Sequence, residues 1–376
     1  MTKLNRFNHL KSNSFTQKSA VINTPEQTQS AATLTSLKQL GWNGFFQQQL
    51  ITESADYTCI ARVSAHHRSQ YQLLTESGEL SLAIHQSMPE MTVGDWLLLD
   101  KQQQFVSLLE RNSLFSRKAA GSKVEQQLIA ANLDWVFIVS SLNDDFNVNR
   151  IERYLALVNE AKVTPVIVLT KVDLCDELSP FIAALRELDA NLLIETVNGL
   201  DKQSTQALSH YCSEGKTVAF IGSSGVGKST LVNALLGESS QITSAIREDD
   251  SKGRHTTTSR SLHLTHSGGL LLDTPGMREL QLADCEDGLN ETFADVVEYA
   301  KQCRFADCQH QHEPGCAVQA AITNNQLTER RLHSYQKLMR EQAMNGASIA
   351  EKRAKDKSLS KMYKRVQSNA RVNKRG

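Results

Sequence analysis

One glycine-rich segment constrains this chain more than any other feature. Residues 222–229 read GSSGVGKS and fit the pattern G-x-x-x-x-G-K-[S/T], directly after an apolar run, TVAFI, and before a helical pattern, STLVNALLG. Such a loop surrounds phosphate with backbone N–H groups at the start of a helix. We therefore predict a nucleotide site in which Lys228 reaches the β- and γ-phosphates and Ser229 binds Mg²⁺. The predicted phosphate-side residues are Gly222, Ser223, Ser224, Gly225, Val226, Gly227, Lys228, Ser229 and Thr230.

The chain around this loop alternates between apolar runs and amphipathic segments. This alternation of strand and helix patterns predicts a mostly parallel sheet that is covered by helices on both faces. We therefore expect a six-stranded α/β domain. The expected strands are 135–140, 166–169, 192–196, 217–221, 261–264 and 270–272, and the expected helices include 148–161 and 180–188.

A second phosphate-side motif, DTPG, begins at Asp273 after the run GLLL, about fifty residues after the glycine-rich loop. Asp273 at a strand end is placed to hold Mg²⁺ through water, and the N–H of Gly276 can bond the γ-phosphate. The polar segment 253–258, GRHTTT, lies between the two motifs, and a Thr hydroxyl there can complete the Mg²⁺ shell and order the loop as a switch. We assign this Mg²⁺ ligand to Thr257, with Thr256 as the alternative. A Thr-rich edge strand is the competing structural interpretation.

A third motif, TKVD, precedes both of these and indicates which base is bound. It comprises Thr170, Lys171, Val172 and Asp173, after the run VIVL. The Asp173 carboxylate can accept from both N1–H and the exocyclic amine of guanine, whereas adenine would leave it unpaired. Lys171 can lay its stem along the base and Thr170 can hold the loop. Taken alone, the motif is explained better by a capping Asp before a helix. Together the three motifs predict that the bound nucleotide is GTP. GTPases have a further loop beside the base, which here falls at 196–198; its sequence, TVN, departs from the common Ser-Ala-like form.

The N-terminal part of the chain has a different pattern. Residues 1–45 are rich in Ser, Thr, Gln and Asn, which predicts a mostly disordered lead-in. Between residues 57 and 113, alternating runs are broken by turn signals about every ten residues, which is typical of a small antiparallel barrel of about five strands. We assign residues 46–115 to an OB-like β-barrel, a fold that often binds nucleic acid, although a structural barrel has the same pattern. The basic residues of the connector 116–123, SRKAAGSK, either contact phosphate or belong to a solvated linker.

Three cysteines and a histidine are crowded near the C-terminal end. Cys303, Cys308, His310 and Cys316 offer three thiolates and an imidazole, which suit tetrahedral Zn²⁺. Four protein ligands close the site, so we expect one structural zinc ion per chain. Buried cysteines without a metal are the alternative, and His312 is an alternative fourth ligand.

The cysteine count and the absence of long apolar runs indicate the compartment. Seven cysteines is an odd number, and the N-terminus has no apolar leader, so a reduced compartment is favoured over disulfides. No run approaches the ~18 apolar residues of a membrane span. We expect a cytoplasmic protein with no membrane partner.

The formal net charge is zero, from 41 basic and 41 acidic residues, but positive charge is concentrated at the C-terminal end. Residues 351–376 contain ten basic and two acidic side chains, so this tail carries +8 and the remainder −8. A solvated helix is one interpretation, but such segregation is typical of a segment that meets a polyanion such as RNA.

The order of the motifs is unusual, because TKVD precedes the phosphate loop whereas an ordinary GTPase has the reverse order. A circularly permuted domain keeps both fold and site, since the original chain ends lie close together at the surface. Over residues 55–345, the chain resembles the RsgA (YjeQ) family of ribosome-dependent GTPases, on the motifs TKVD, GSSGVGKST, GRHTTT and DTPG and the Cys/His spacing, in that order.

This resemblance implies an OB domain, a permuted GTPase domain over 116–280 and a helical zinc domain over 281–350, with the basic tail 351–376 outside it. It also implies action in late maturation of the small (30S) ribosomal subunit, and it places the zinc ligand at His310. We therefore expect a monomeric GTPase that binds GTP and GDP, the 30S subunit and its rRNA.

The catalytic machinery lacks one common part. Many GTPases have a water-positioning Gln just after the DxxG motif, but Met277 stands there. We expect slow intrinsic hydrolysis that ribosome binding stimulates, with Lys228, Gly276 and His255 as the catalytic residues. His255 is the candidate for positioning water, or it only packs the loop. The rival functions are a metabolic P-loop kinase or ATPase, and an RNA-binding scaffold whose nucleotide site is a binding switch.

Overall fold

The computed structural model describes residues 35–53, 55–118, 126–143, 145–237, 260–273 and 285–346. Within these residues, no helix has both the length and the apolar character to cross a bilayer. The predicted 253–258 segment, most of the DTPG motif and the basic tail lie outside the described residues.

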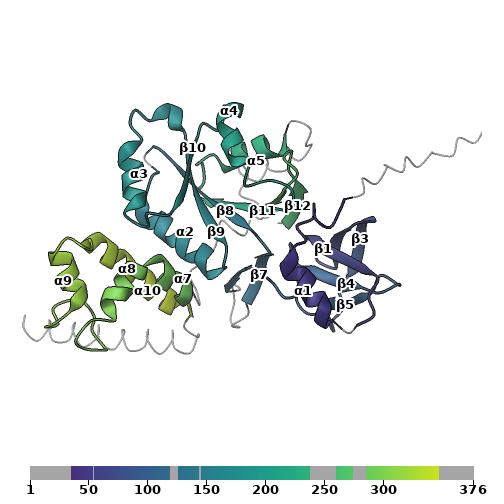
Figure 1. Cartoon of the computed structure of the whole chain (residues 1–376), viewed down its shortest axis with the longest axis horizontal. Coiled ribbons are helices and arrows are strands. Elements are labelled where there is room, and N and C mark those ends of the chain that lie inside the picture. The colour runs from purple at the N-terminus through teal and green to yellow at the C-terminus, as the bar shows by residue number, and fades with distance from the viewer. Residues whose placement is uncertain are drawn as a thin grey trace, which may run out of the picture. The chain divides into compact units, whose positions relative to one another are not determined.

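Strands from the middle of the chain form a mostly parallel sheet (Figure 1). Its strand order is β10-β9-β8-β11-β13-β12; only β12 is antiparallel to its neighbour β13, and the other pairs are parallel. The six predicted strands are therefore confirmed, each within two residues of its expected bounds. They are β8 (Trp135–Ser141), β9 (Thr164–Thr170), β10 (Leu193–Val197), β11 (Thr217–Gly222), β12 (Arg260–Leu264) and β13 (Leu270–Asp273).

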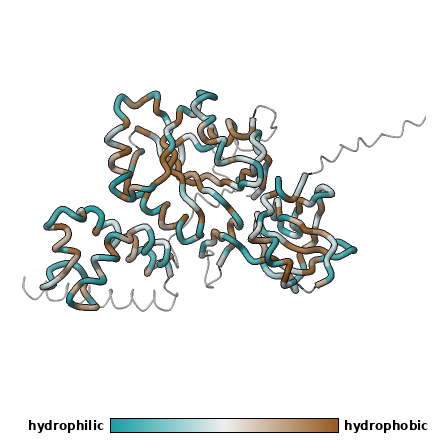
Figure 2. Tube along the Cα trace, viewed as in Figure 1, coloured by the Kyte–Doolittle hydropathy of each residue, from teal (hydrophilic) through white to brown (hydrophobic). Residues whose placement is uncertain are grey.

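Helices cover both faces of this sheet because its strands are apolar on both sides. Side chains along β8 alternate between two cores, with Val136 and Ile138 in one and Phe137 and Val139 in the other. The first core is closed by α2 and the second by α5, and Figure 2 shows the apolar residues concentrated along the central strands. The helical segments of this domain are α2 (Val148–Glu160), α3 (Ser179–Arg186), α4 (Lys202–Thr205) and α5 (Lys228–Leu236), with 3₁₀ turns η1 (Val172–Leu174) and η2 (Gln206–Leu208).

The five strands expected in the N-terminal region are present. Their antiparallel order is β3-β2-β1-β4-β5, around a core that includes Val63, Leu73 and Leu97. Strand β1 also pairs with β12, at Ala65 opposite Ser261, so the two sheets are continuous. The strands are β1 (Cys59–His66), β2 (Gln70–Thr75), β3 (Gly78–Ala83), β4 (Trp96–Leu99) and β5 (Phe105–Leu108).

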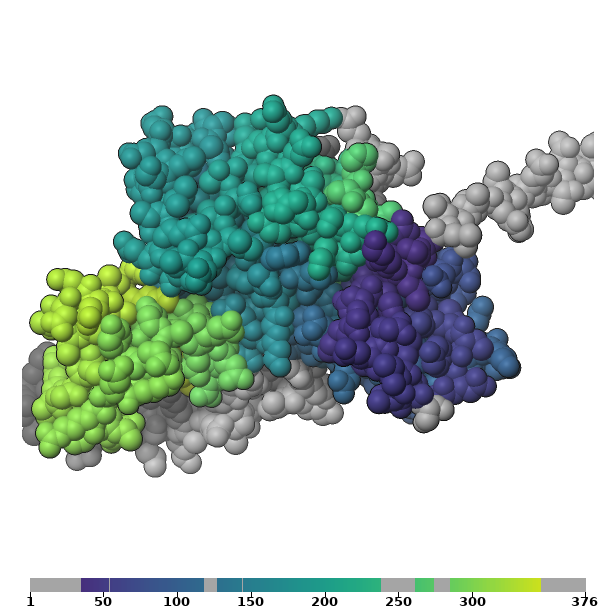
Figure 3. Space-filling model, in the orientation of Figure 1, coloured from purple at the N-terminus to yellow at the C-terminus, as the bar shows by residue number. Residues whose placement is uncertain are grey.

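Residues 35–45, which the sequence places in a disordered lead-in, are packed instead. Leu40 is buried and Trp42 lies 5.0 Å from the Trp96 ring centroid, in a second core at the end of this region. Helix α1 (Gly44–Thr52) begins directly afterwards and buries Phe46 in the same core, so these residues and the strands pack into one body (purple and blue in Figure 3). The prediction failed here because a few large apolar side chains suffice to anchor a short polar segment. Residues 1–34 of the lead-in lie outside the described residues.

One buried cation joins the two sheets. The Arg62 guanidinium on β1 donates to the carbonyl of Leu40, to that of Asn132 at 3.0 Å and to the Thr217 hydroxyl at 2.9 Å. Burial lowers the pKa of Arg62 to about 10, which leaves it charged at neutral pH. Because β11 begins at Thr217, this network ties β1 to the strand that leads into the glycine-rich loop.

The connector predicted between barrel and central domain contains a β-hairpin. Strand β6 (Leu114–Lys118) pairs antiparallel with β7 (Gln126–Ala131), with Leu114 opposite Ala131. Arg117 donates to Gln127 across this pair at 2.9 Å. The sequence analysis missed these two strands because the basic segment 116–123, SRKAAGSK, resembles a linker. Residues 119–125 lie outside the described residues.

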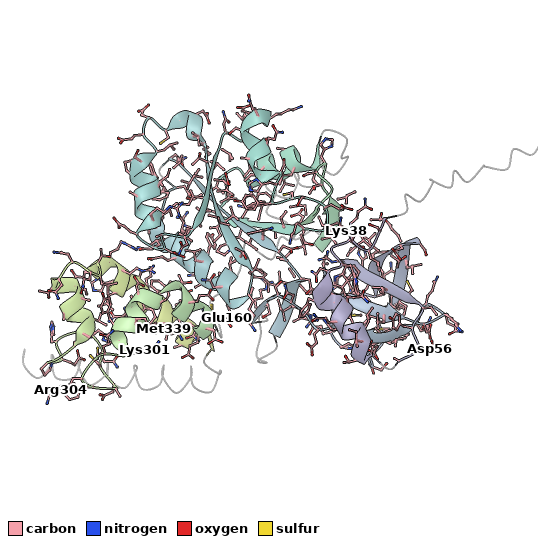
Figure 4. All side chains as sticks on the ribbon, viewed as in Figure 1. Lys38, Asp56, Glu160, Lys301, Arg304 and Met339 are labelled. Atoms are coloured by element: carbon pink, nitrogen blue, oxygen red, sulfur yellow. The ribbon has the colours of Figure 1, made fainter. Side chains whose placement is uncertain are left out.

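The C-terminal module is helical, as expected. It packs on α2, where the Glu160 carboxylate (labelled in Figure 4) accepts from the Gly288 N–H at 2.8 Å. A Cβ at Gly288 would lie 2.2 Å from the carbonyl oxygen of Ala156, so only glycine allows this approach. The helices are α7 (Glu286–Thr292), α8 (Ala294–Ala300), α9 (Ala317–Thr323) and α10 (Glu329–Gly346).

Candidate nucleotide site and metal cluster

The predicted nucleotide motifs meet at the carboxyl edge of the parallel sheet. Gly222 ends β11, Thr170 ends β9 and Asp273 ends β13, and these strands run in the same direction. Ligands of open α/β sheets bind outside this edge. The topology therefore gathers residues that are about a hundred positions apart in the sequence.

The glycine-rich loop has a backbone that its glycines permit. Gly222 has φ +146°, and a Cβ there would lie 2.3 Å from the carbonyl oxygen of Val139 on the neighbouring strand β8. Gly227 has φ +98° and caps helix α5. Both are positions where a side chain is strained, so the loop shape follows directly from the motif.

The lysine of this loop lies inside it. Lys228 is 8% exposed, and its ammonium donates to the carbonyl of Gly222 at 2.8 Å and to that of Ser223. Ser229 and Thr230 follow in the first turn of α5 and are half-buried. The chain thus places one cation and two hydroxyls at a helix N-terminus, the arrangement that favours phosphate.

The TKVD motif is fixed to the glycine-rich loop. The buried Thr170 hydroxyl donates to the carbonyl of Val226 at 2.6 Å, so Thr170 holds the two loops together. Lys171 has φ +60°, which turns the chain into η1, where Asp173 is exposed. The Asp173 carboxylate is therefore free of the core and available to a ligand.

The third base-side segment, 196–198, also reaches α5. The Asn198 N–H donates to the Ser204 hydroxyl at 2.8 Å, and a Cβ on the next residue, Gly199, would lie 3.4 Å from the Thr230 side chain. This loop therefore borders the site even though its sequence departs from the common form.

Asp273 is the last residue of β13 and is half-buried, opposite Ser261 of β12. On the same strand as Ser261, the half-buried His263 ring bonds the Ser261 hydroxyl at 2.7 Å, and this partial burial lowers the pKa of His263. The remaining predicted residues, His255, Thr257 with its alternative Thr256, and Gly276, lie outside the described residues.

Sequence reasoning missed one residue that touches the loop. Arg150, in the first turn of α2, donates to the Ser223 hydroxyl and to the Asp145 carboxylate, both at 2.5 Å. Its side chain is 37% exposed. No motif marks it, because an arginine in the first turn of an amphipathic helix is common on solvent-facing surfaces.

The four predicted metal ligands converge in the C-terminal module. The ligand atoms of Cys303, Cys308, His310 and Cys316 all lie within 4.8 Å of one another. The sulfur atoms of Cys303 and Cys316 are 3.8 Å apart, and each lies 3.5–3.6 Å from His310 Nδ1. A tetrahedron with arms of about 2.3 Å to sulfur and about 2.0–2.1 Å to nitrogen has edges close to these lengths. The cluster therefore fits a tetrahedral metal ion and excludes a disulfide between these sulfurs.

The loop that carries His310 is held by a carboxylate. Glu313 accepts from the backbone N–H groups of Gln309 at 2.9 Å, Gln311 at 2.8 Å and His312 at 3.1 Å. These backbone hydrogen bonds lower the pKa of Glu313 to about 2. His312, the alternative ligand, is exposed and is not part of the cluster.

Comparisons with known proteins agree with this geometry. A family model described as RsgA GTPase matches residues 108–283. A model described as ABC transporter also matches residues 205–366, a range that includes the phosphate loop but not the TKVD motif. Phosphate loops are common to ATP- and GTP-binding proteins, so the second match does not distinguish a guanine from an adenine nucleotide.

Relatives and solved structures cover most of the chain. "Small ribosomal subunit biogenesis GTPase RsgA 2" of Vibrio parahaemolyticus is 64% identical over 340 residues, which is 90% of this chain and 95% of the relative. The crystal structure of YjeQ from Thermotoga maritima matches 75% of this chain and 98% of its own at 25% identity and a TM-score of 0.55. The structure of YloQ, described as a circularly permuted GTPase, matches 78% of this chain and 99% of its own at 22% identity and a TM-score of 0.54. The strand and motif order seen here is thus that of a circularly permuted fold.

Proposed function

The chain belongs to the RsgA family of small ribosomal subunit biogenesis GTPases, and from that premise we propose that it binds the 30S subunit and hydrolyses GTP during late maturation of that subunit. We propose further that the subunit stimulates turnover. The observation that carries the proposal is the hydrogen bond from Thr170 to Val226, which holds the guanine-type motif against the phosphate loop.

Recognition of GTP divides between the two loops. Asp173 accepts from the guanine N1–H and amine, and Lys171 lies along the base. Backbone N–H groups of residues 222–229 surround the phosphates, and Lys228 neutralises charge on the β- and γ-phosphates. The buried position of Lys228 supports this role, because a cation in a low-dielectric loop acts more strongly on nearby phosphate than one in water.

Mg²⁺ would be held by Ser229, Asp273 and Thr257. The ion would neutralise negative charge that develops on the phosphates during hydrolysis. The half-buried Asp273, at the end of the strand beside β11, suits this role through water, as its carboxylate is an oxygen donor of the type that Mg²⁺ prefers.

Hydrolysis by the chain alone is expected to be slow. Met277 cannot orient water, because its thioether is at most a weak acceptor. We propose that the subunit orders the loops, with the Gly276 N–H on the γ-phosphate and His255 positioning water.

The metal cluster is proposed to hold one Zn²⁺ per chain. Three thiolates and one imidazole are ligands that suit zinc, and the 3.8 Å sulfur separation supports it. All four positions are protein ligands, so the ion is structural.

The remaining assignments complete the proposal. We propose a cytoplasmic monomer that contacts rRNA, with an OB-like domain over 46–115, a GTPase domain over 116–280 and a zinc domain over 281–350. The basic tail, 351–376, would add phosphate contacts through its +8 charge.

Steady-state GTP hydrolysis tests the function. The purified, zinc-replete protein is assayed alone and with isolated 30S subunits, with ATP and a Lys228→Ala variant as controls. Strong stimulation that is confined to GTP and lost in the variant is the expected result. Turnover of ATP would favour a P-loop kinase or ATPase, and equal, slow turnover with and without subunits would favour a scaffold that uses GTP only as a binding switch.

A further inference from the structure

A cleft lies beside the phosphate loop, between α2 and α10. Its volume is about 800 Å³, and Ser223 of the phosphate loop forms part of its wall. It is therefore contiguous with the candidate nucleotide site, yet most of its lining comes from two helices. The charged residues of this lining are Arg150, Arg153, Arg330, His333, Lys337 and Glu341.

The charged side chains of this lining are mainly basic. Four arginine or lysine side chains and one histidine face a single carboxylate, Glu341, which is paired with Arg153 at 2.6 Å. Arg330 is paired at 3.1 Å with Glu152, a carboxylate buried behind the wall. Lys337 has no hydrogen-bond or ion-pair partner among the described residues. Arg150, Arg153 and Arg330 are thus held in place by carboxylates, while Lys337 remains available to a ligand.

The spacing of the basic residues on α10 indicates an extended ligand. Arg330, His333 and Lys337 follow one another at three and four positions and share one face of the helix. At 1.5 Å per residue, the first and last are about 10 Å apart along the axis. Consecutive phosphates of a nucleic acid strand match such a spread of cations along the helix.

We propose that this cleft binds a phosphodiester backbone of small-subunit rRNA and that Arg150 relays its presence to the phosphate loop. The inference rests on the proposed function and names the surface and the residue through which the subunit acts. RNA fits better than a protein segment because α10 leads in sequence toward a tail of +8, so the basic character continues along the chain.

The relay follows from the contacts of Arg150. Its guanidinium is shared between the Asp145 carboxylate and the Ser223 hydroxyl, and its side chain lines the cleft. A backbone phosphate that enters the cleft competes for the same guanidinium. This competition alters the hydrogen bond from Arg150 to the Ser223 hydroxyl. RNA binding in the cleft therefore changes a contact of the phosphate loop itself. Arg150 acts here as a positioning residue.

Two matched substitutions on α10 test the binding surface. Lys337→Ala removes a cleft cation, and Arg340→Ala removes another exposed cation, three residues later, that does not line the cleft. Binding of each full-length variant to isolated 30S subunits and to naked small-subunit rRNA is measured between 50 and 200 mM salt. We expect Lys337→Ala to make the slope of log affinity against log salt shallower by about 0.7–0.9 on both probes. We expect the slope of Arg340→Ala to match that of the wild type.

Arg150→Ala tests the relay through the kinetics. We expect the maximal stimulation of GTP hydrolysis by saturating subunits to fall by about tenfold or more, because the variant lacks the hydrogen bond from Arg150 to Ser223 that links the cleft to the phosphate loop. For Lys337→Ala, we expect the concentration of subunits for half-maximal stimulation to rise while the maximum is retained. An Arg150→Ala variant with wild-type maximal stimulation would overturn the relay.

The outcomes separate this inference from the function on which it rests. Equal slopes for Lys337→Ala and Arg340→Ala would overturn the cleft as the RNA surface. A Lys337→Ala effect on intact subunits but not on naked rRNA would assign the cleft to a ribosomal protein and would also overturn it. Wild-type protein that binds rRNA in a Lys337-dependent way without any stimulation would refute the proposed stimulation and the relay but support the RNA surface.

Discussion

Removing the Glu152 carboxylate should make α10 open from α2 more often. Glu152, on α2, is 0% exposed and accepts from Arg331 at 2.7 Å, Arg330 at 3.1 Å and the Ser334 hydroxyl. Arg331 is itself only 3% exposed, so Glu152→Ala leaves a buried cation with one carboxylate fewer. All three donors belong to α10.

The expected cost follows from the remaining partners of Arg331. Breaking a buried ion pair by removing one partner costs about 3–5 kcal/mol. Arg331 keeps the Asp295 carboxylate at 3.0 and 3.1 Å and two backbone carbonyls, so we expect the lower end, about 3 kcal/mol. At 1.4 kcal/mol per factor of ten, local opening of α10 becomes about 100-fold more populated.

Native-state amide hydrogen exchange measures this opening directly. Protection of α10 amides should fall about 100-fold in Glu152→Ala, while amides of β2 in the N-terminal region keep their protection. Glu298→Ala is the control, since Glu298 forms an exposed pair with Lys301 that is worth less than about 1 kcal/mol. Protection of α10 within threefold of wild type in Glu152→Ala would refute the reasoning.

The remaining predictions concern the loop, the metal and the thiols. Gly222→Ala should abolish GTP binding measured by calorimetry while retaining the circular dichroism of the wild type, because the new Cβ would lie 2.3 Å from a backbone carbonyl and the loop must move. Glu313→Gln should speed zinc release to a chromogenic chelator, since an amide accepts the loop N–H bonds less strongly than a carboxylate and His310 loses its support; an unchanged release rate would contradict this. Burial raises the pKa of Cys212 and Cys285 to about 12, so at pH 8 only about one in 10⁴ of these thiols is ionised, and iodoacetamide should label them only after unfolding. Labelling of either thiol in the native protein within minutes would show that its environment is not the one described.

Much of the nucleotide site was readable from the sequence because its backbone is locally encoded. A loop that needs Gly222 and Gly227 at positive φ permits few other residues, and it requires a strand before it and a helix after it. Most of the central strands were predictable for a related reason: β8, β9, β11 and β13 are buried along most of their length and are therefore nearly continuous apolar runs. The metal cluster was predictable because thiolate and imidazole ligands recur at short spacing.

The failures of prediction share one physical cause. Residues 35–45 and the strands β6 and β7 mix polar with apolar residues, and their order depends on the packing of a few apolar side chains against distant parts of the chain. No local pattern reveals such contacts, because the partner residues are remote in sequence.

The sequence by itself determined the chemistry available to this protein: a phosphate loop, a carboxylate for guanine and four metal ligands, each encoded within a few neighbouring residues. Only the tertiary structure decided how these parts are joined. Arg62 lies in a strand pattern and Arg150 and Glu152 in a helix pattern, and nothing local distinguishes them from surface charges. Folding places Arg62 against β11, Arg150 on the phosphate loop and Glu152 beneath α10. A charge is costly to bury unless partners surround it, and each of these three side chains has a partner that is 70 to 180 residues away in the chain.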